Sequence, residues 1–152
     1  MAYITPKTNW AVNIVNGVYT GDFFNAADYN RIADNILYVA QLAEALYSVV
    51  IPLEEMRTMT AASIPYADDF NALEANIQSI CTAVTMPSSW TGQQTWYANG
   101  TAPLVADWNR WEATIRDLKA RIDYDARWVG FLTKDDEVFI TADDEEFKVL
   151  EA

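Results

Sequence analysis

The feature that most constrains this chain is a short phrase that occurs three times. It reads ADYNRIADNI from Ala27, DDFNALEANI from Asp68 and ADWNRWEATI from Ala106. Each copy holds an Asp, an aromatic residue and an Asn in succession, and apolar residues follow at intervals of three and four. Those intervals keep apolar side chains on one face of an α-helix. The repeat therefore predicts three related helices.

Each copy opens an apolar stripe that continues along the chain. The first stripe holds Tyr29, Ile32, Ile36, Val39, Ala43, Leu46 and Val50, the second Phe70, Leu73, Ile77, Ile80 and Val84, and the third Trp108, Trp111, Ile115, Leu118 and Ile122. We expect Pro52 to end the first helix, because proline lacks a backbone donor and clashes with the preceding turn. Three narrow stripes predict a three-helix bundle. They fit parallel and antiparallel packing, and packing within one chain or between chains.

The repeated polar residues have the chemistry of a helix start. They are Asp28, Asn30, Asp69, Asn71, Asp107 and Asn109. We expect each Asp near the start of its helix, where the helix dipole favours a carboxylate, and we expect Asn25 and Asp28 to form a capping box. Ser63 and Thr101, each followed by a proline, are further helix-start signals. Asn is a poor residue inside a helix, so we expect the repeated Asn to bond to the loop that enters the helix or to a neighbouring helix.

The chain as a whole is predicted to be mainly α, with an extended arm before the bundle and a β-hairpin-like extension after it. Residues 1–22 show no helical period and contain short β-prone pieces, which indicates the arm. Residues 23–126 form the bundle and include an aromatic loop at 85–102. Residues 127–152 carry the β-prone runs WVGFLT, EVFIT and FKVLEA between acidic clusters, which indicates an acidic β-like extension.

Composition limits the possible partners and compartments. The net charge is -12 and the chain has no His, which disfavours both phosphate contacts to nucleic acid and an anionic membrane surface. No apolar stretch approaches the ~20 residues that cross a bilayer. Cys81 is the only cysteine, so an intrachain disulfide is excluded. The start, MAYITPKTNW, lacks the pattern of a signal peptide, and we expect a soluble protein kept in a reducing compartment.

Catalytic chemistry is sparse. Without His, no Ser-His-Asp or Cys-His arrangement can form, and Cys81 lies beside the second stripe, where a buried structural thiol is expected. The acidic clusters lack the spacing of an EF-hand loop, and nothing singles out a pair of carboxylates for cell-wall hydrolysis. We therefore predict no catalytic residue, no cofactor and no metal, and a protein that is not an enzyme.

Aromatic residues outside the predicted helices are the candidates for partner binding. They are Trp10, Tyr19, Trp90, Trp96, Tyr97, Trp128, Phe139 and Phe147. Two interpretations of loop 85–102 stay open: it folds back over the bundle, or its aromatic side chains anchor a partner. Trp108 and Trp111 lie on the third stripe and are expected in the core.

The residues also carry a family resemblance. The stretch YITPKTNW…GDFFNAADYNRIADNI resembles the opening of small proteins from the structural gene clusters of tailed phages and prophages of Gram-positive bacteria, and PLVADWNRWE resembles another form of that signature. The similarity covers residues 3–46 and 99–122. The matching residues are Asp28, Tyr29, Asn30, Arg31, Asp107, Trp108, Asn109 and Arg110. The second copy departs from the signature, with Ala72 in place of Arg, and lacks whatever contact that Arg makes.

The resemblance implies a non-enzymatic component of a virion: a tail, baseplate, collar or fibre-attachment protein. Its partners would be copies of itself, as a homo-oligomer in the particle, and other virion proteins, after synthesis in the cytoplasm of the host bacterium. The alternative is a small acidic phage-encoded inhibitor that mimics DNA toward a host protein. Against that alternative, residues 134–152 hold eight acids and two lysines, so half of the negative charge lies at one end.

Overall fold

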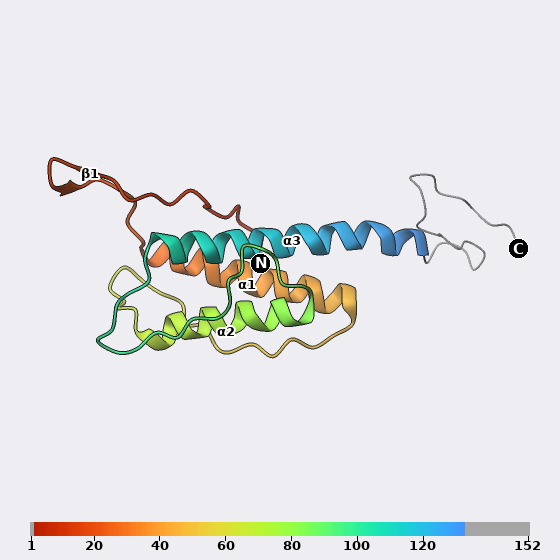
Figure 1. Ribbon diagram of the computed structural model, residues 1–152. Coiled ribbons are helices and arrows are strands. Elements are labelled where there is room, and N and C mark those ends of the chain that lie inside the picture. Colours follow the sequence, from red (N-terminus) through yellow and green to blue (C-terminus); the bar gives the residue numbers. More distant parts are fainter. Residues whose placement is uncertain (1, 133–152) are drawn as a thin grey trace, which may run out of the picture.

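The computed structural model describes residues 2–132, with side chains described as far as Trp128. The elements are β1 (Ile14–Val15), β2 (Val18–Tyr19), α1 (Ala26–Tyr47), α2 (Ala67–Ala83) and α3 (Val105–Leu132). The protein is mainly α, with three packed helices and a small two-stranded hairpin in the N-terminal arm (Figure 1). This confirms the predicted mainly α fold with three packed helices. The predicted extension beyond residue 132 lies outside the described residues.

The three helices run parallel, each beginning at the same end of the bundle (Figure 1). The Tyr29 hydroxyl at the start of α1 donates to the Asp69 carbonyl at the start of α2, at 3.3 Å. The Phe70 ring of α2 stacks near the Trp111 ring of α3, with centroids 6.1 Å apart. A 22-residue helix is ~33 Å long, so an extended return needs only ~10 residues. Both connections, 48–66 and 84–104, exceed that length.

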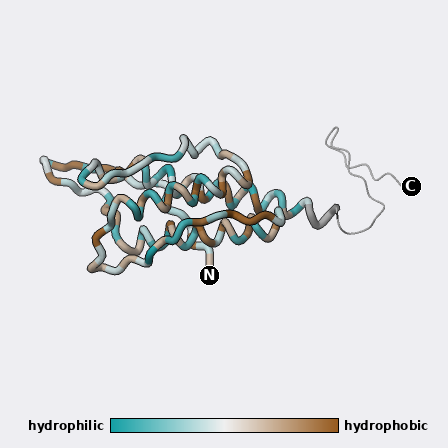
Figure 2. Tube along the Cα trace, turned by 90° about the horizontal axis from the view of Figure 1, so that it is seen from below, coloured by the Kyte–Doolittle hydropathy of each residue, from teal (hydrophilic) through white to brown (hydrophobic). Residues whose placement is uncertain are grey.

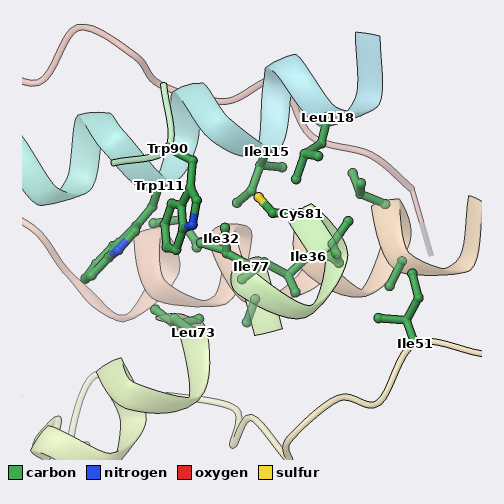
Figure 3. Close-up of a cluster of buried hydrophobic side chains, with 14 of the residues drawn as sticks. Ile32, Ile36, Ile51, Leu73, Ile77, Cys81, Trp90, Trp111, Ile115 and Leu118 are labelled. Carbon is green, nitrogen blue, oxygen red and sulfur yellow. The ribbon is translucent and has the colours of Figure 1, made fainter. Parts of the chain in front are cut away.

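The apolar stripes meet along the centre of the bundle (Figure 3). Ile36, Ile77 and Leu118 are 0 % exposed, one from each helix. The thiol of Cys81 lies among them and is also buried, as expected. The prediction for Val50 is wrong: α1 ends at Tyr47 and Val50 is exposed. The helix stops before Pro52 because Ser48 adopts a left-handed conformation, with φ of 54°.

All three helices begin with the same contact. The repeated Asp accepts a hydrogen bond from the backbone N–H three residues earlier, and in α1 the Asn25 side chain also caps the helix, which confirms the capping box. The three donor–acceptor pairs are Asn25 and Asp28 at 3.1 Å, Tyr66 and Asp69 at 2.6 Å, and Leu104 and Asp107 at 2.9 Å. Ser63 does not cap α2. Its hydroxyl instead accepts from the Thr60 N–H at 2.8 Å and closes a turn.

The repeated Asn side chains bind extended backbone, but neither the loop that enters their own helix nor a neighbouring helix, as had been expected. Each binds the segment that leads to another helix of the bundle. Each accepts from the N–H of one residue and donates to the carbonyl of the same residue, an arrangement we call an Asn clip. The clips join Asn30 to Met59 (2.8 and 2.8 Å), Asn71 to Trp96 (2.7 and 3.0 Å) and Asn109 to Trp10 (2.9 and 2.9 Å). Each clip therefore satisfies two backbone groups of a segment that has no sheet partner there.

A second set of clips lies five residues further along two of the helices. Asn35 clips Ile4 and Asn76 clips Glu54, whereas α3 has Thr114 at this place, whose hydroxyl donates to its own helix. Through these contacts the N-terminal arm bridges α3 and α1, and the first connection bridges α1 and α2. Each repeat is thus an extended segment followed by a helix, and the three repeats close into a ring.

Buried ion pairs join the helices of neighbouring repeats. Arg31 of α1 pairs with Glu112 of α3 at 2.5 Å, and Arg110 of α3 pairs with Glu74 of α2. At the corresponding places of the third interface stand Ala72 and Ala33, both buried. The Arg of the signature therefore makes a contact within the chain. Where the second copy lacks the Arg, the acid that would face it is also missing, so no buried charge is left unpaired.

The predicted boundary between the bundle and the C-terminal extension, at residues 126 and 127, is wrong. Residues 127–132, predicted as the beginning of the β-like extension, continue α3. Pairs four residues apart favour helix here: Lys119 pairs with Asp123, and Arg121 pairs with Asp125. None of the helices in the described part of the chain is both long and apolar enough to cross a membrane.

Candidate interaction surface

Most of the aromatic candidates serve the domain itself. Trp10 and Trp90 are 5 % and 6 % exposed, and Trp96 is half-buried against the core. The Trp90 indole donates to Gln78 at 2.8 Å, and the Arg110 guanidinium lies 4.7 Å from the Trp90 ring. Loop 85–102 therefore folds back over the bundle. The rings of Trp10 and Trp90, expected as partner contacts, are instead buried against the bundle of their own chain.

The other candidates have different positions. Tyr97 is 72 % exposed, and Tyr19 and Trp128 are half-buried. The Trp128 ring lies 6.0 Å from that of Tyr124 on α3. Phe139 and Phe147 lie outside the described residues.

A feature that sequence reasoning missed is the β-hairpin of the arm. Ile14 pairs with Tyr19 and Val15 pairs with Val18 in antiparallel register. The turn is Asn16-Gly17, with φ of 51° and 78°, both in the left-handed region. An Asn-Gly pair between β-prone residues is the strongest local signal for a two-residue hairpin, so the sequence did contain it.

The two strands are tied together at the base of the hairpin, and the arm is held on the bundle just before this base. The Asp22 carboxylate accepts from the Ala11 N–H at 2.8 Å and from Lys7 at 2.6 Å. These contacts, with Lys7 the stronger, hold the pKa of Asp22 below its ordinary 3.8. Gly21 is required there, because a Cβ would lie 2.6 Å from the Ala11 carbonyl oxygen. Trp10, which directly precedes Ala11, is held on α3 by the Asn109 clip.

Beyond this base the hairpin exposes aliphatic side chains. Val12, Ile14, Val15 and Val18 are 60, 63, 50 and 63 % exposed. The projecting arm is coloured as hydrophobic along part of its length in Figure 2, and residues 8–21 carry no charged side chain. Monomeric surfaces seldom expose so many neighbouring aliphatic residues, so this arm is the strongest candidate interaction surface in the described part of the chain.

Two open clefts lie at the same end of the bundle, where the helices begin. The Met59 cleft has a volume of about 640 Å³, and its lining includes Phe24, Tyr29, Asn30, Met59, Ala61 and Pro65. The Trp96 cleft has a volume of about 790 Å³, and its lining includes Asp68, Phe70, Asn71, Trp96, Ala98 and Pro103. The two are equivalent in the repeat: each lies between a helix-start aromatic residue and a backbone segment held by an Asn clip.

The third equivalent position is filled by the chain itself. The Phe24 ring stacks on Trp108 with centroids 5.0 Å apart, and lies 5.9 Å from the Trp10 ring. Phe24 precedes the cap of α1, where the other repeats have Pro65 and Pro103. The larger side chain closes this cleft, whereas proline leaves the other two open.

The buried ionisable groups are engaged in structure. Burial raises the pKa of the Cys81 thiol to about 12, which leaves it un-ionised and inert as a nucleophile. Burial also raises the pKa of Glu112, against the opposing effect of Arg31. Within the described residues, no group of three or more Cys, Asp or Glu is arranged to hold a metal ion.

The fold and these surfaces define a mainly α domain with a projecting β-arm. Compared with models of protein families, with curated proteins and with solved structures, the chain matches none.

Proposed function

We propose that this protein is a non-enzymatic structural component of a bacteriophage virion, as a tail, baseplate, collar or fibre-attachment protein. The observation that carries the proposal is the hairpin arm: an element anchored on the bundle at Trp10 whose aliphatic side chains are left uncovered. Such an element gains most of its free energy when another subunit covers it. In a particle those subunits are copies of this chain and other virion proteins.

Two further points support this proposal. The resemblance to phage structural proteins rests on the helix-start phrase and on the arm around Trp10, and in the fold these two are physically joined by the Asn109 clip. Helix α3 ends at the end of the bundle opposite to the hairpin (Figure 1). We include the acidic, β-prone sequence 133–152 in the proposal as a second arm that reaches a neighbouring subunit.

The inhibitor alternative has less support. A DNA mimic needs carboxylates whose field extends into solvent. In the described part of the chain, nine carboxylates are instead paired with cations: Asp22, Asp28, Asp69, Glu74, Asp107, Glu112, Asp117, Asp123 and Asp125. Pairing shortens the range of their field, and we therefore favour the structural role.

The proposal is tested on phage particles released by the bacterium that carries the gene. Quantitative mass spectrometry of purified particles should find the chain in a fixed whole-number ratio to the other structural proteins. Within residues 1–22, limited proteolysis should cut the exposed hairpin in the dilute free chain and spare it in the particle, because the arm is covered there. Absence of the chain from purified particles would contradict the proposal.

A further inference from the structure

The hairpin is an addition to the repeat that builds the bundle. In the second and third repeats, 10 and 11 positions separate the residue held by an Asn clip from the helix-start Asp, against 18 in the first repeat. These pairs are Met59 and Asp69, Trp96 and Asp107, and Trp10 and Asp28. Two of the three repeats therefore connect clip and helix without the extra residues that form the hairpin. The extra residues of the first repeat serve something other than the bundle.

The hairpin is also incomplete by itself. Successive strand residues point to opposite faces, so Ile14 and Val15 place aliphatic side chains on both faces. Each strand has an edge without a ladder partner in the described sheet. An isolated two-stranded hairpin is marginal in water. Contact with another surface would cover at least one aliphatic face.

The Met59 cleft has the chemistry to cover such a face. Its lining carries no charged side chain, and its volume lies within the ~300–1,000 Å³ of ordinary binding pockets. Aliphatic side chains can enter it without burying a charge. The Trp96 cleft differs, because Asp68 is part of its wall. Of the two open clefts, the Met59 cleft is therefore the better match for an uncharged hairpin.

The third position of the ring indicates what such a cleft receives. There the occupant is an apolar side chain of the arm itself, Phe24, stacked on Trp108. Phe24 also lines the Met59 cleft, so the hairpin base and the cleft form one continuous surface. A continuous surface that holds both a projecting element and its receptor allows two copies to pair about a two-fold axis, each receiving the element of the other.

Electrostatics favour the same partner. Two chains that each carry a net charge of -12 repel one another over most of their surfaces. The hairpin stretch 8–21 and the lining of the Met59 cleft carry no charge, so two copies can meet there without bringing carboxylates together. The uncharged match between the two surfaces argues for a second copy of this chain.

We propose that two copies of the chain exchange their arms, with the β1–β2 hairpin of each copy seated in the Met59 cleft of the other. This dimer rests on the proposed assembly function and deepens it by naming the partner of the hairpin. The exchange buries the exposed aliphatic side chains of both arms and fills the Met59 cleft of each copy.

Sedimentation equilibrium of the full chain tests the dimer. We expect a monomer–dimer equilibrium in the micromolar range. Ile14→Asp in the hairpin and Ala61→Glu in the cleft should each weaken it at least ~tenfold, because each would bury an unpaired carboxylate in an apolar contact. Both positions are exposed, so the helical circular dichroism should persist. The matched controls are Val50→Asp, just beyond the far end of α1, and Ala98→Glu in the Trp96 cleft, which should leave the dissociation constant unchanged.

Cross-linking tests the geometry. An Ile14→Cys chain mixed with an Ala61→Cys chain should form a mixed disulfide on mild oxidation, while Cys81 stays buried and silent. An Ala98→Cys chain should not react with the Ile14→Cys chain. A monomer at all concentrations, a dimer unaffected by Ile14→Asp, or cross-linking only between two Ile14→Cys chains would each overturn the arm exchange.

These outcomes are separate from those for the proposed function. A chain that is present in particles but monomeric in solution overturns the exchange alone. A dimer with the expected cross-link in a chain that particles lack overturns the virion role alone.

Discussion

The bundle and the hairpin arm use the same aliphatic residues in opposite ways. In the bundle, Ile36 and Ile77 are 0 % exposed, whereas Ile14 in the arm is 63 % exposed. Burial of each such side chain stabilises a fold by about 1.5–3 kcal/mol. The bundle has already gained that free energy within the chain, and the arm gains it only from another molecule. Mutations should therefore separate the two regions: losses of stability in the bundle, losses of association in the arm.

The largest effect is expected from a buried charge left without its partner. Arg110→Ala leaves Glu74 uncompensated inside the bundle, since the two form a buried ion pair. We expect a loss of about 3–5 kcal/mol in the free energy of unfolding, measured by urea denaturation. The control is Arg116→Ala on the same helix, whose side chain is 52 % exposed and pairs with Asp117. That exposed pair should contribute at most ~1 kcal/mol. Equal losses would contradict the role of the buried pair.

The next effect compares two isoleucines directly. Ile77→Ala removes a fully buried side chain and should cost about 2–5 kcal/mol of stability. Ile14→Ala in the arm should change stability by no more than ~0.5 kcal/mol. Thermal and urea denaturation of both variants measure the difference. A large loss at Ile14 would mean that the hairpin supports the fold of its own chain.

A smaller effect is expected from the clips. Asn71→Ala removes both hydrogen bonds to the Trp96 backbone, and unpaired buried backbone groups cost about 1–3 kcal/mol. Amide hydrogen exchange at Trp96 should become faster under conditions where the domain as a whole stays folded, because the connecting segment detaches locally. Gln41→Ala, an exposed position on α1, is the control. Unchanged exchange at Trp96 in Asn71→Ala would contradict the clip.

The smallest effect is a pH dependence of opposite sign for two carboxylates, Asp22 in the arm and Glu112 in the bundle. The pKa of Asp22 is lowered in the folded arm, so the support it gives the hairpin base is present above pH 3.8 and is lost as pH falls through its folded pKa. The pKa of Glu112 is raised in the bundle, so its contribution to stability declines as pH rises from 4.5 through its folded pKa. A carboxyl NMR titration should place the two on opposite sides of their ordinary values. If the pKa values of Asp22 and Glu112 were both raised or both lowered, this contrast would be contradicted.

The parts of the fold that could be read from the sequence are local. The helix starts at Asp28, Asp69 and Asp107 were predictable because a capping contact spans three residues. The hairpin was also readable from Asn16-Gly17, although it was missed. The second clips had a signal as well, since an Asn follows the first one by five positions in the first two copies of the repeat, at Asn35 and Asn76.

Other features depended on residues far apart in the chain. Nothing near Arg110 indicates that its partner is Glu74 rather than a residue of another subunit. The burial of Trp10 and Trp90, predicted as partner contacts, follows from grooves that exist only once three helices stand side by side. The predicted end of the bundle at residue 126 was wrong for a similar reason. The β-prone residues 127–132 continue α3, because the context of an established helix overrides their local propensity.

By itself, the sequence determined three helices, the face that each turns inward and the chemistry at each helix start, because all of these depend on neighbours within a few residues. The tertiary structure alone decided that the helices run parallel, that extended segments are clipped between them, and that two clefts stay open while Phe24 fills the third position. Those outcomes depend on contacts between residues up to 99 positions apart, such as Trp10 with Asn109. Such pairings are selected by the packing of the whole domain.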